Sequence, residues 1–166
     1  DGEDHAAMSK RAMADDMVTL METLGFPEFA VVGHDRGARV ARRLALDQPE
    51  VVERLVLIDI VPTRTVFETV NREVATAYYH WFFLIQPERL PERLIGADPD
   101  AFLDFCLFRL GRGAEHFDDR AVAEYRRQIH DPEALHAMCE DYRAAASVDL
   151  AHDAADSDAR ILSPTL

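Results

Sequence analysis

The feature that most constrains the fold is a short apolar segment, FAVVGHD at residues 29–35, which runs directly into a helix-like segment at residues 36–46. The apolar segment is rich in β-branched residues and lacks polar alternation, which is typical of a parallel strand covered on both faces. Gly33 and Gly37 stand two residues to either side of Asp35. In a small–x–nucleophile–x–small turn the central residue is strained, and the glycines let strand and helix pass closely. The sequence therefore predicts either a turn that presents Asp35 as a nucleophile or a plain turn in which Asp35 caps the helix.

Two further segments extend this pattern into an alternation of helices and strands. Residues 9–24 repeat apolar side chains at spacings of three and four, with Ser9 placed as the N-cap and Gly25 as the residue that ends the helix. The repeated side chains are Met13, Met17, Leu20, Met21 and Leu24. A second apolar segment, LVLIDIV, predicts a strand at residues 55–61. Helix, strand, helix and strand in this order indicate an α/β doubly wound sheet.

The remaining residues do not supply the strands that such a sheet needs. A parallel sheet of two strands leaves unpaired backbone groups at its edges and buries too little apolar surface to offset chain entropy, so either partner strands are missing or the sheet interpretation is wrong. From residue 63 to about residue 147 the pattern is helical. Its first apolar stripe consists of Phe67, Val70, Val74, Tyr78 and Trp81. The last residues, ARILSPTL, resemble the start of a further strand.

We therefore expect a partial α/β core that is interrupted by a helical insertion. Residues 1–62 would form the core segment with the turn, residues 63–147 a helical cap, and residues 148–166 the return to the core. On this interpretation the sequence is the middle of a larger protein, truncated at both ends. We expect the 166 residues alone to fold weakly and to complete no catalytic turnover.

The charge composition indicates which kinds of molecule the protein binds. The chain has 18 basic and 31 acidic residues, and the net charge of −13 opposes extended contact with nucleic acid or with an anionic membrane. A small-molecule partner is favoured instead. Cys106 and Cys139 show no metal-ligand spacing, so we interpret them as packing residues in a reduced, cytoplasmic compartment, and we expect neither a metal nor an organic cofactor.

The stretches VVGHDRGARVARRLALDQP, VLIDIVPT, YYHWFFLIQP, LPERLIGADPD and MCEDYRA together resemble one group of proteins. They are similar to the α/β-hydrolases whose nucleophile is an aspartate, which include haloalkane dehalogenases, epoxide hydrolases and haloacetate dehalogenases, and most of all to the fluoroacetate dehalogenases. The resemblance runs over essentially the whole chain. It implies conversion of a short 2-haloacid and water to glycolate and halide through an aspartyl ester, and it implies a homodimer.

An aspartate nucleophile suits displacement at a saturated carbon, which explains an acid at Asp35 where esterases place serine. An anionic nucleophile that meets a haloacetate meets a second anion, so fixed positive charge is needed. Arg36 and Arg39 lie in the first helical turn, where cations oppose the helix dipole by roughly 0.3 to 1 kcal/mol each. A bound substrate carboxylate explains this pair better than a solvated face does. We expect Arg42 and Arg43 to be solvated or in surface ion pairs.

Asp59 lies at the expected carboxyl end of the second strand, the side on which α/β enzymes assemble their sites. The resemblance implies that Asp59 orients a catalytic histidine, and the alternative is an aspartate that caps the following turn. The base should follow the acid in chain order. None of the histidines after Asp59 suits that role, and the resemblance implies that the base follows the last residue. Those histidines are His80, His116, His130, His136 and His152.

His80 and Trp81 fall in the helical region, where an aromatic residue such as Trp81 usually belongs to the core. The resemblance implies instead that the N–H groups of both side chains, with the hydroxyl of Tyr142, line a halide pocket. Fluoride leaves poorly unless hydrogen bonds take up its charge, so converging donors suit C–F cleavage. We assign no catalytic role to His34.

Two other functions stay open. An epoxide hydrolase would use the same aspartyl ester and would polarise the epoxide oxygen with tyrosines of the helical region. The tyrosines available are Tyr78, Tyr79, Tyr125 and Tyr142. A non-catalytic binding module of the α/β-hydrolase type would keep the turn and lack the base.

Overall fold

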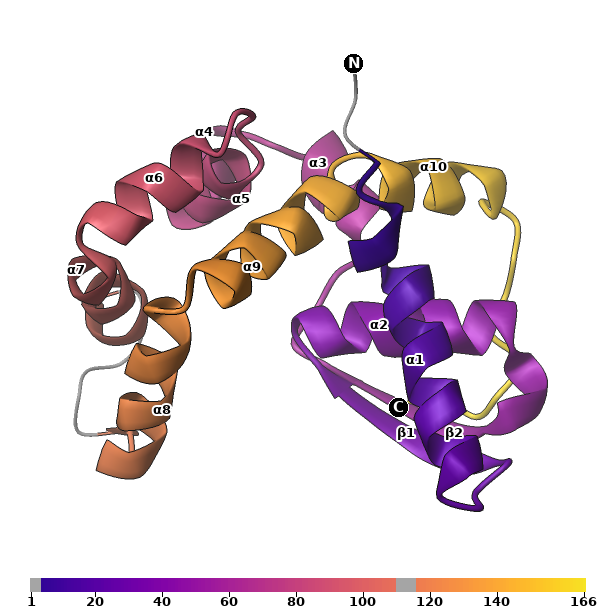
Figure 1. The fold of residues 1–166 in the computed structure, drawn as a ribbon. Coiled ribbons are helices and arrows are strands. Elements are labelled where there is room, and N and C mark those ends of the chain that lie inside the picture. The colour runs from indigo at the N-terminus through magenta and orange to yellow at the C-terminus, as the bar shows by residue number, and fades with distance from the viewer. Residues whose placement is uncertain (1–3, 110–115) are drawn as a thin grey trace. The chain divides into compact units, whose positions relative to one another are not determined.

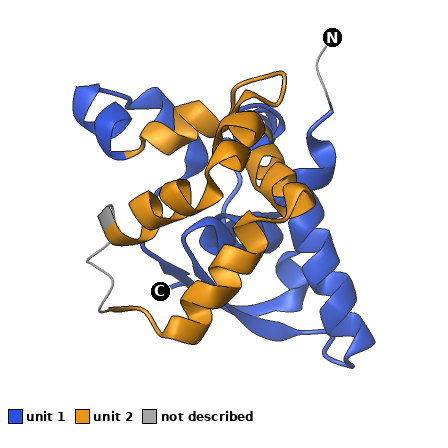
Figure 2. Ribbon diagram, turned by 60° about the vertical axis from the view of Figure 1, so that its left-hand side comes forward, with its two compact units in different colours: residues 1–77, 144–166 blue, residues 78–143 orange. Residues whose placement is uncertain are grey.

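The structure is a computed structural model and describes residues 4–109 and 116–166. Its contacts divide the chain into two units (Figure 2). Unit 1 comprises residues 1–77 and 144–166, and unit 2 comprises residues 78–143. The second unit lies inside the range of residues 63–147 that the sequence indicates for a helical cap, and the role of that range as a cap stays a prediction.

Unit 1 contains two parallel strands joined by a helix (Figure 1). Its elements are a short 3-10 turn at Ala6–Met8, α1 (Lys10–Thr23), β1 (Phe29–His34), α2 (Arg36–Asp47), a second 3-10 turn at Pro49–Val51, β2 (Val52–Ile58), α3 (Thr63–Glu68), α4 (Arg72–Ala77) and α10 (Val148–Ala155). The strand register runs from Phe29 opposite Val52, past an irregularity, to His34 opposite Ile58. The predicted α/β alternation is thus present.

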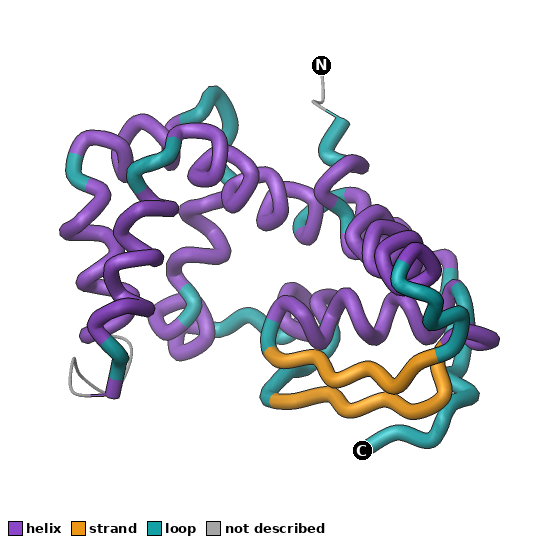
Figure 3. The backbone as a smooth tube through the Cα atoms, turned by 60° about the horizontal axis from the view of Figure 1, so that its bottom comes forward, coloured by secondary structure: helices purple, strands orange, loops and turns teal. Residues whose placement is uncertain are grey.

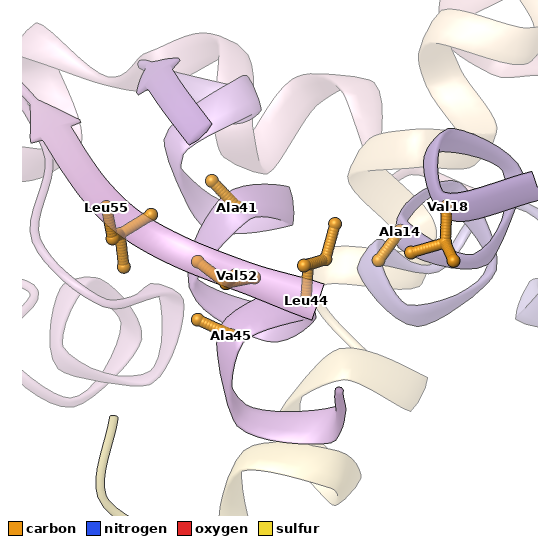
Figure 4. Close-up of a cluster of buried hydrophobic side chains, with 7 residues drawn as sticks. All are labelled: Ala14, Val18, Ala41, Leu44, Ala45, Val52 and Leu55. Atoms are coloured by element: carbon orange, nitrogen blue, oxygen red, sulfur yellow. The ribbon is translucent and has the colours of Figure 1, made fainter. Parts of the chain in front are cut away.

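Helix α2 covers one face of the two strands, and α1 packs against α2 (Figure 3). The buried cluster beneath them is small and apolar (Figure 4). It consists of Ala14, Val18, Ala41, Leu44, Ala45, Val52 and Leu55. Alanines at the contact allow two helices to approach closely, so this cluster fixes α2, and with it the turn that precedes α2, against the strands.

The predicted ends of α1 are confirmed. The Ser9 hydroxyl accepts a hydrogen bond from the backbone N–H of Ala12 at 3.1 Å, and Gly25 takes a left-handed conformation with φ of 85°. The apolar repeat that predicted the helix does not form its buried face, since Ala14 and Val18 are buried whereas Leu24 is 59% exposed. The smaller side chains of Ala14 and Val18, and not the longer ones of the predicted repeat, form the buried face of α1.

The second strand begins three residues earlier than predicted and ends at Ile58, because pairing with β1 extends it through the charged residues Glu53 and Arg54. The C-terminal segment runs beside β2, as its sequence indicated. Leu55 donates to Pro164 O at 2.9 Å, and Leu166 donates to Leu55 O at 3.0 Å.

Coverage of both sheet faces is not observed within the described residues. Val32 is 67% exposed and Ile58 is 44% exposed, although both belong to the paired strands. One face of the paired strands is thus exposed in this part of the chain, and coverage of both faces stays a prediction.

The described residues of unit 2 form helices joined by short loops, with no strand among them. Its elements are α5 (Tyr79–Leu84), α6 (Leu90–Ala97), α7 (Pro99–Asp104), a π-helical turn at Phe105–Arg109, α8 (Asp119–Ile129) and most of α9 (Pro132–Ala145). Its core cluster consists of Leu84, Ile95, Ile129, Leu135 and Cys139. Both cysteines are free thiols, and burial raises the pKa of Cys139 to about 12, which fits the predicted packing role.

The apolar stripe predicted from residue 67 to residue 81 is divided among α3, α4 and α5. The Asn71 side chain accepts a hydrogen bond from Val74 N at 2.9 Å, which starts a new helix inside the stripe. Val70 and Tyr78 are exposed, so the stripe is not one buried face. Every helix in the described residues is too short or too polar to cross a membrane.

Candidate active site

Asp35 lies in the turn between β1 and α2 with a strained backbone. Its φ of 48° and ψ of −122° place a non-glycine residue in a sparsely populated region, which costs on the order of 1 to 3 kcal/mol. Its N–H donates to Ile58 O at 3.2 Å, and its carbonyl accepts from Ala38 N at 3.0 Å, so both neighbouring elements hold the turn. The side chain is 65% exposed and makes no capping hydrogen bond to α2. A plain capping aspartate does not account for this geometry.

The two glycines beside Asp35 differ in what they do. A Cβ on Gly33 would lie 2.5 Å from the Cα of Ala38, so glycine is required for β1 and α2 to pass each other. A Cβ on Gly37 would meet no described atom within 4 Å. The prediction that both glycines serve the close approach is therefore confirmed for Gly33 and wrong for Gly37.

Positive charge is held beside the Asp35 carboxylate. Arg39 Nη1 lies 3.2 Å from Asp35 Oδ1, and the Arg39 side chain is only 7% exposed. Arg36 is partly buried, and both of its terminal nitrogens are buried. The exposed carboxylate thus has a charge-assisted hydrogen bond to a buried guanidinium.

Arg43 is not at the surface, contrary to expectation. Its guanidinium is buried and contacts Asp47, Asp153 and Asp156 at 2.9, 3.2 and 2.6 Å, which ties α10 to α2. Burial opposes its charge, but the hydrogen bonds to these carboxylates outweigh burial and raise the pKa of Arg43. Arg42 pairs with Asp153 at 2.9 Å, as expected of an ion pair.

Asp59 follows β2 directly and also has a left-handed backbone, with φ of 54°. Because His34 and Ile58 are paired, Asp35 and Asp59 leave neighbouring parallel strands at the same edge of the sheet. Asp59 is exposed, and within the described residues its carboxylate accepts no hydrogen bond. It therefore does not cap the turn that follows, and its carboxylate is available to another group.

In unit 2 the three residues assigned to halide binding come together in one aromatic cluster. The Tyr142 ring lies 5.9 Å from that of His80 and 6.1 Å from that of Trp81, both in edge-to-face contact. Trp81 is 3% exposed, whereas His80 and Tyr142 are partly buried. Tyr78 also contacts the rings of His80 and Trp81, each at 6.1 Å.

A cluster that the sequence did not reveal joins α6 and α9. Glu92, His136 and Glu140 place ligand-type atoms within 4.8 Å of one another. Arg143 donates to Glu92 at 2.7 Å and to Glu140 at 2.8 Å, so a guanidinium already neutralises these carboxylates and the cluster does not suit a metal ion. Glu92 and Arg143 lie 51 positions apart, so no local sequence pattern indicated the cluster.

The family model for the alpha/beta hydrolase fold matches residues 2–166. The chain belongs to the α/β hydrolase fold family. This confirms the resemblance and the predicted partial α/β core, and it agrees with the Asp35 turn between the parallel strands and α2.

Three relatives of this chain add detail. A fluoroacetate dehalogenase from Burkholderia sp is 51% identical over 98% of this chain and 54% of its own length. An α/β hydrolase crystal structure from Nostoc sp PCC 7120 has a TM-score of 0.94 at 54% identity, over 97% of this chain and 55% of that one. A Pseudomonas aeruginosa structure, provisionally named an epoxide hydrolase, has a TM-score of 0.92 at 49% identity over 99% of this chain and 55% of that one. The chain thus spans about half the length of the relatives it matches.

Proposed function

We propose that the protein carrying this chain hydrolyses the carbon–halogen bond of short 2-haloacids such as fluoroacetate or chloroacetate. The observation that carries the proposal is the exposed Asp35 carboxylate in its strained turn, with the buried Arg39 guanidinium 3.2 Å away. The likeness to a fluoroacetate dehalogenase over nearly the whole chain supports the same reaction.

In the proposed reaction Asp35 attacks the halogen-bearing carbon opposite the leaving group. The carbon–halogen bond breaks, halide departs with the electron pair, and a glycolyl ester of Asp35 forms. Water then attacks the carboxyl carbon of that ester, which releases glycolate and a proton and restores the Asp35 carboxylate. We propose that Asp59 orients the histidine that acts as the base in this second step. We assign no histidine of this chain as that base.

Arg36 and Arg39 supply the charge that the first step needs. Two carboxylates, one from Asp35 and one from the substrate, repel each other unless cations lie between them. Arg39 already contacts Asp35, and a second guanidinium from Arg36 lets both anions be neutralised at once. Arginine suits the task because its planar fork binds a carboxylate through paired donors.

His80, Trp81 and Tyr142 are proposed to take up the halide. Each offers an N–H or O–H donor, and their rings form one cluster in unit 2. Donors that meet the departing ion matter most for fluoride, which is the poorest leaving group among the halides.

Replacement of the nucleophile tests the proposal. In the full-length protein, Asp35→Asn should reduce fluoride release from fluoroacetate by on the order of a thousandfold or more, because an amide does not displace fluoride. Asp16→Asn, an exposed change on α1, is the matched control and should retain activity. Full activity in the Asp35 variant would rule out this nucleophile.

An epoxide hydrolase is the second candidate, and Tyr78 is the observation that favours it. Its ring contacts His80 and Trp81, and it is 47% exposed, so a second tyrosine hydroxyl accompanies Tyr142 at the cluster. Paired tyrosines suit polarisation of an epoxide oxygen. Diol formation from epoxides without halide release from haloacetates would favour this function over the dehalogenase.

The cellular setting and the assembly are also proposals. The free thiols of Cys106 and Cys139 suit a reduced, cytoplasmic compartment. We further propose a homodimer that acts on a small anionic haloacid, and the molar mass of the full-length protein in solution tests the dimer.

A further inference from the structure

The side chain that follows Tyr142 is a buried arginine with an unusual number of partners. Arg143 Nη1 and Nη2 donate to the two oxygens of Glu92 at 2.7 and 2.9 Å, which forms a paired fork. Nη1 also donates to Glu140 at 2.8 Å. Nη2 and Nε donate to the carbonyl oxygen of Gln86 at 2.8 and 3.3 Å. The side chain is only 4% exposed, so water competes little for these bonds.

These contacts connect the elements that carry the proposed halide donors. Gln86 lies two residues beyond α5, which holds His80 and Trp81, and Glu92 lies in the first turn of α6. The segment between them includes Glu88 and Arg89, both with left-handed backbones, φ 57° and 54°. Arg143 therefore fixes an irregular segment between α5 and α6 to the part of α9 that carries Tyr142.

The rings alone define their spacing less sharply. His80 and Trp81 meet Tyr142 through edge contacts at 5.9 and 6.1 Å, and such contacts tolerate small shifts of a helix along its axis. A bidentate guanidinium–carboxylate pair does not, because both hydrogen bonds lengthen when either partner moves. The spacing of the donors is thus set by the charged fork more than by the rings.

We propose that Arg143, through its fork with Glu92 and its bonds to Gln86, is a positioning residue that sets the distance between the hydroxyl of Tyr142 and the donors of His80 and Trp81, and thereby the preference for fluoride over larger halides. This inference rests on the proposed function. Fluoride is small and requires closely spaced donors, whereas bromide is large and leaves readily with looser ones. Loosening the fork should therefore impair C–F cleavage more than C–Br cleavage.

The test compares two substrates in the full-length protein. Arg143→Lys keeps the charge and loses the fork, and Glu92→Gln keeps the shape and loses the carboxylate. In both variants kcat for fluoroacetate should fall on the order of tenfold, while kcat for bromoacetate should change by less than about threefold. Arg126→Lys is the matched control, because Arg126 also bridges two carboxylates, Asp100 and Asp104, at 2.5 and 2.6 Å. Its ratio of fluoroacetate to bromoacetate turnover should stay unchanged.

The possible outcomes separate the two proposals. Equal loss on both substrates, or loss of the folded state in both variants, would assign the fork to stability alone and overturn the positioning role. No change in either variant would overturn it as well. If the unaltered protein released neither fluoride nor bromide, the proposed function itself would fail, and the positioning role would fail with it.

Discussion

At the scale of single residues, the charges around the Asp35 turn bear on the charge of the substrate as well as on the type of reaction. A carboxylate in a strained turn indicates a nucleophile, and haloalkanes would serve such a nucleophile without any arginine. Arg39, buried and 3.2 Å from Asp35, is useful chiefly when the substrate is itself an anion.

Arg39→Ala in the full-length protein should therefore discriminate between substrates. Turnover of chloroacetate should fall on the order of tenfold to a hundredfold more than turnover of a neutral chloroalkane of similar size, because only the former needs its charge neutralised. The ratio of the two kcat/KM values is the measurement. Arg42→Ala, which lies on the same helix and pairs with Asp153 instead, is the control and should leave that ratio unchanged. Equal losses on both substrates would refute the role of Arg39 as a carboxylate ligand.

The two glycines of the turn offer a second matched pair. Gly33→Ala should lower the free energy of unfolding by about 1 to 3 kcal/mol, because the new Cβ would lie 2.5 Å from the Ala38 Cα. In Gly37→Ala the new Cβ would have no described atom within 4 Å. This variant should raise the free energy of unfolding by less than about 1 kcal/mol, because alanine favours a helix more than glycine does. Denaturant unfolding of both variants measures the difference, and equal destabilisation would contradict the account of close packing.

Sequence reasoning succeeded where a residue's environment is local. The Ser9 cap and the contacts of Gly33 and Asp35 with Ala38 and Arg39 join residues within five positions, so the pattern of residue types specified them, although Ile58 also holds the Asp35 turn. Arg43 was misplaced because its partners Asp153 and Asp156 lie more than a hundred positions away. The fork of Arg143 with Glu92, 51 positions apart, was missed for the same reason.

At the scale of elements, hydrophobic runs predicted which elements exist more accurately than where they end. The run LVLIDIV predicted a strand at residues 55–61, yet pairing with β1 starts β2 at Val52 and ends it at Ile58. Asp59 follows β2 directly and leaves the sheet edge beside Asp35, where its position in the apolar run had placed it. Asn71 broke the predicted stripe because its capping bond competes with continued helix.

The contact between Glu92 of α6 and Arg143 and His136 of α9 should make the stability of the folded state depend on pH. Burial acts to raise the pKa of Glu92, but hydrogen bonds from Arg143 and His136 outweigh it and lower that pKa from 4.5 to about 2. A lowered carboxyl pKa stabilises the folded state above about pH 4.5, and this stability is lost as the pH falls from about 4.5 to about 2. The loss should be on the order of 1 to 3 kcal/mol.

Glu92→Gln isolates that effect, because the amide does not titrate. The difference in unfolding free energy between the unaltered protein and this variant, measured by urea denaturation, should shrink across the same pH range. A difference that stays constant from pH 5 to pH 2.5 would show that the Glu92 carboxylate is not stabilised by its partners.

At the scale of the whole molecule, the two strands present an apolar face that the described residues leave open. Val32 and Ile58 lie on paired strands, yet their exposed fractions are 67% and 44%. The chain spans about half the length of the relatives it matches. An open face of this kind lowers the free energy gained on folding.

The 166-residue chain by itself should therefore unfold without a sharp transition and should release at most one equivalent of fluoride from fluoroacetate. Circular dichroism during urea titration and a fluoride electrode measure both properties. The full-length protein is the control. A cooperative transition together with multiple-turnover fluoride release would contradict the expectation.

The central claim, that Asp35 forms an ester which water hydrolyses at the aspartyl carbon, is tested most directly by a single turnover in water enriched in ¹⁸O. The full-length protein in molar excess is mixed with fluoroacetate, digested, and its Asp35 peptide is weighed by mass spectrometry. The account predicts one ¹⁸O atom in the Asp35 carboxylate and none in the glycolate alcohol. Label in the glycolate and none in Asp35 would mean that water attacks the substrate directly, and would contradict it.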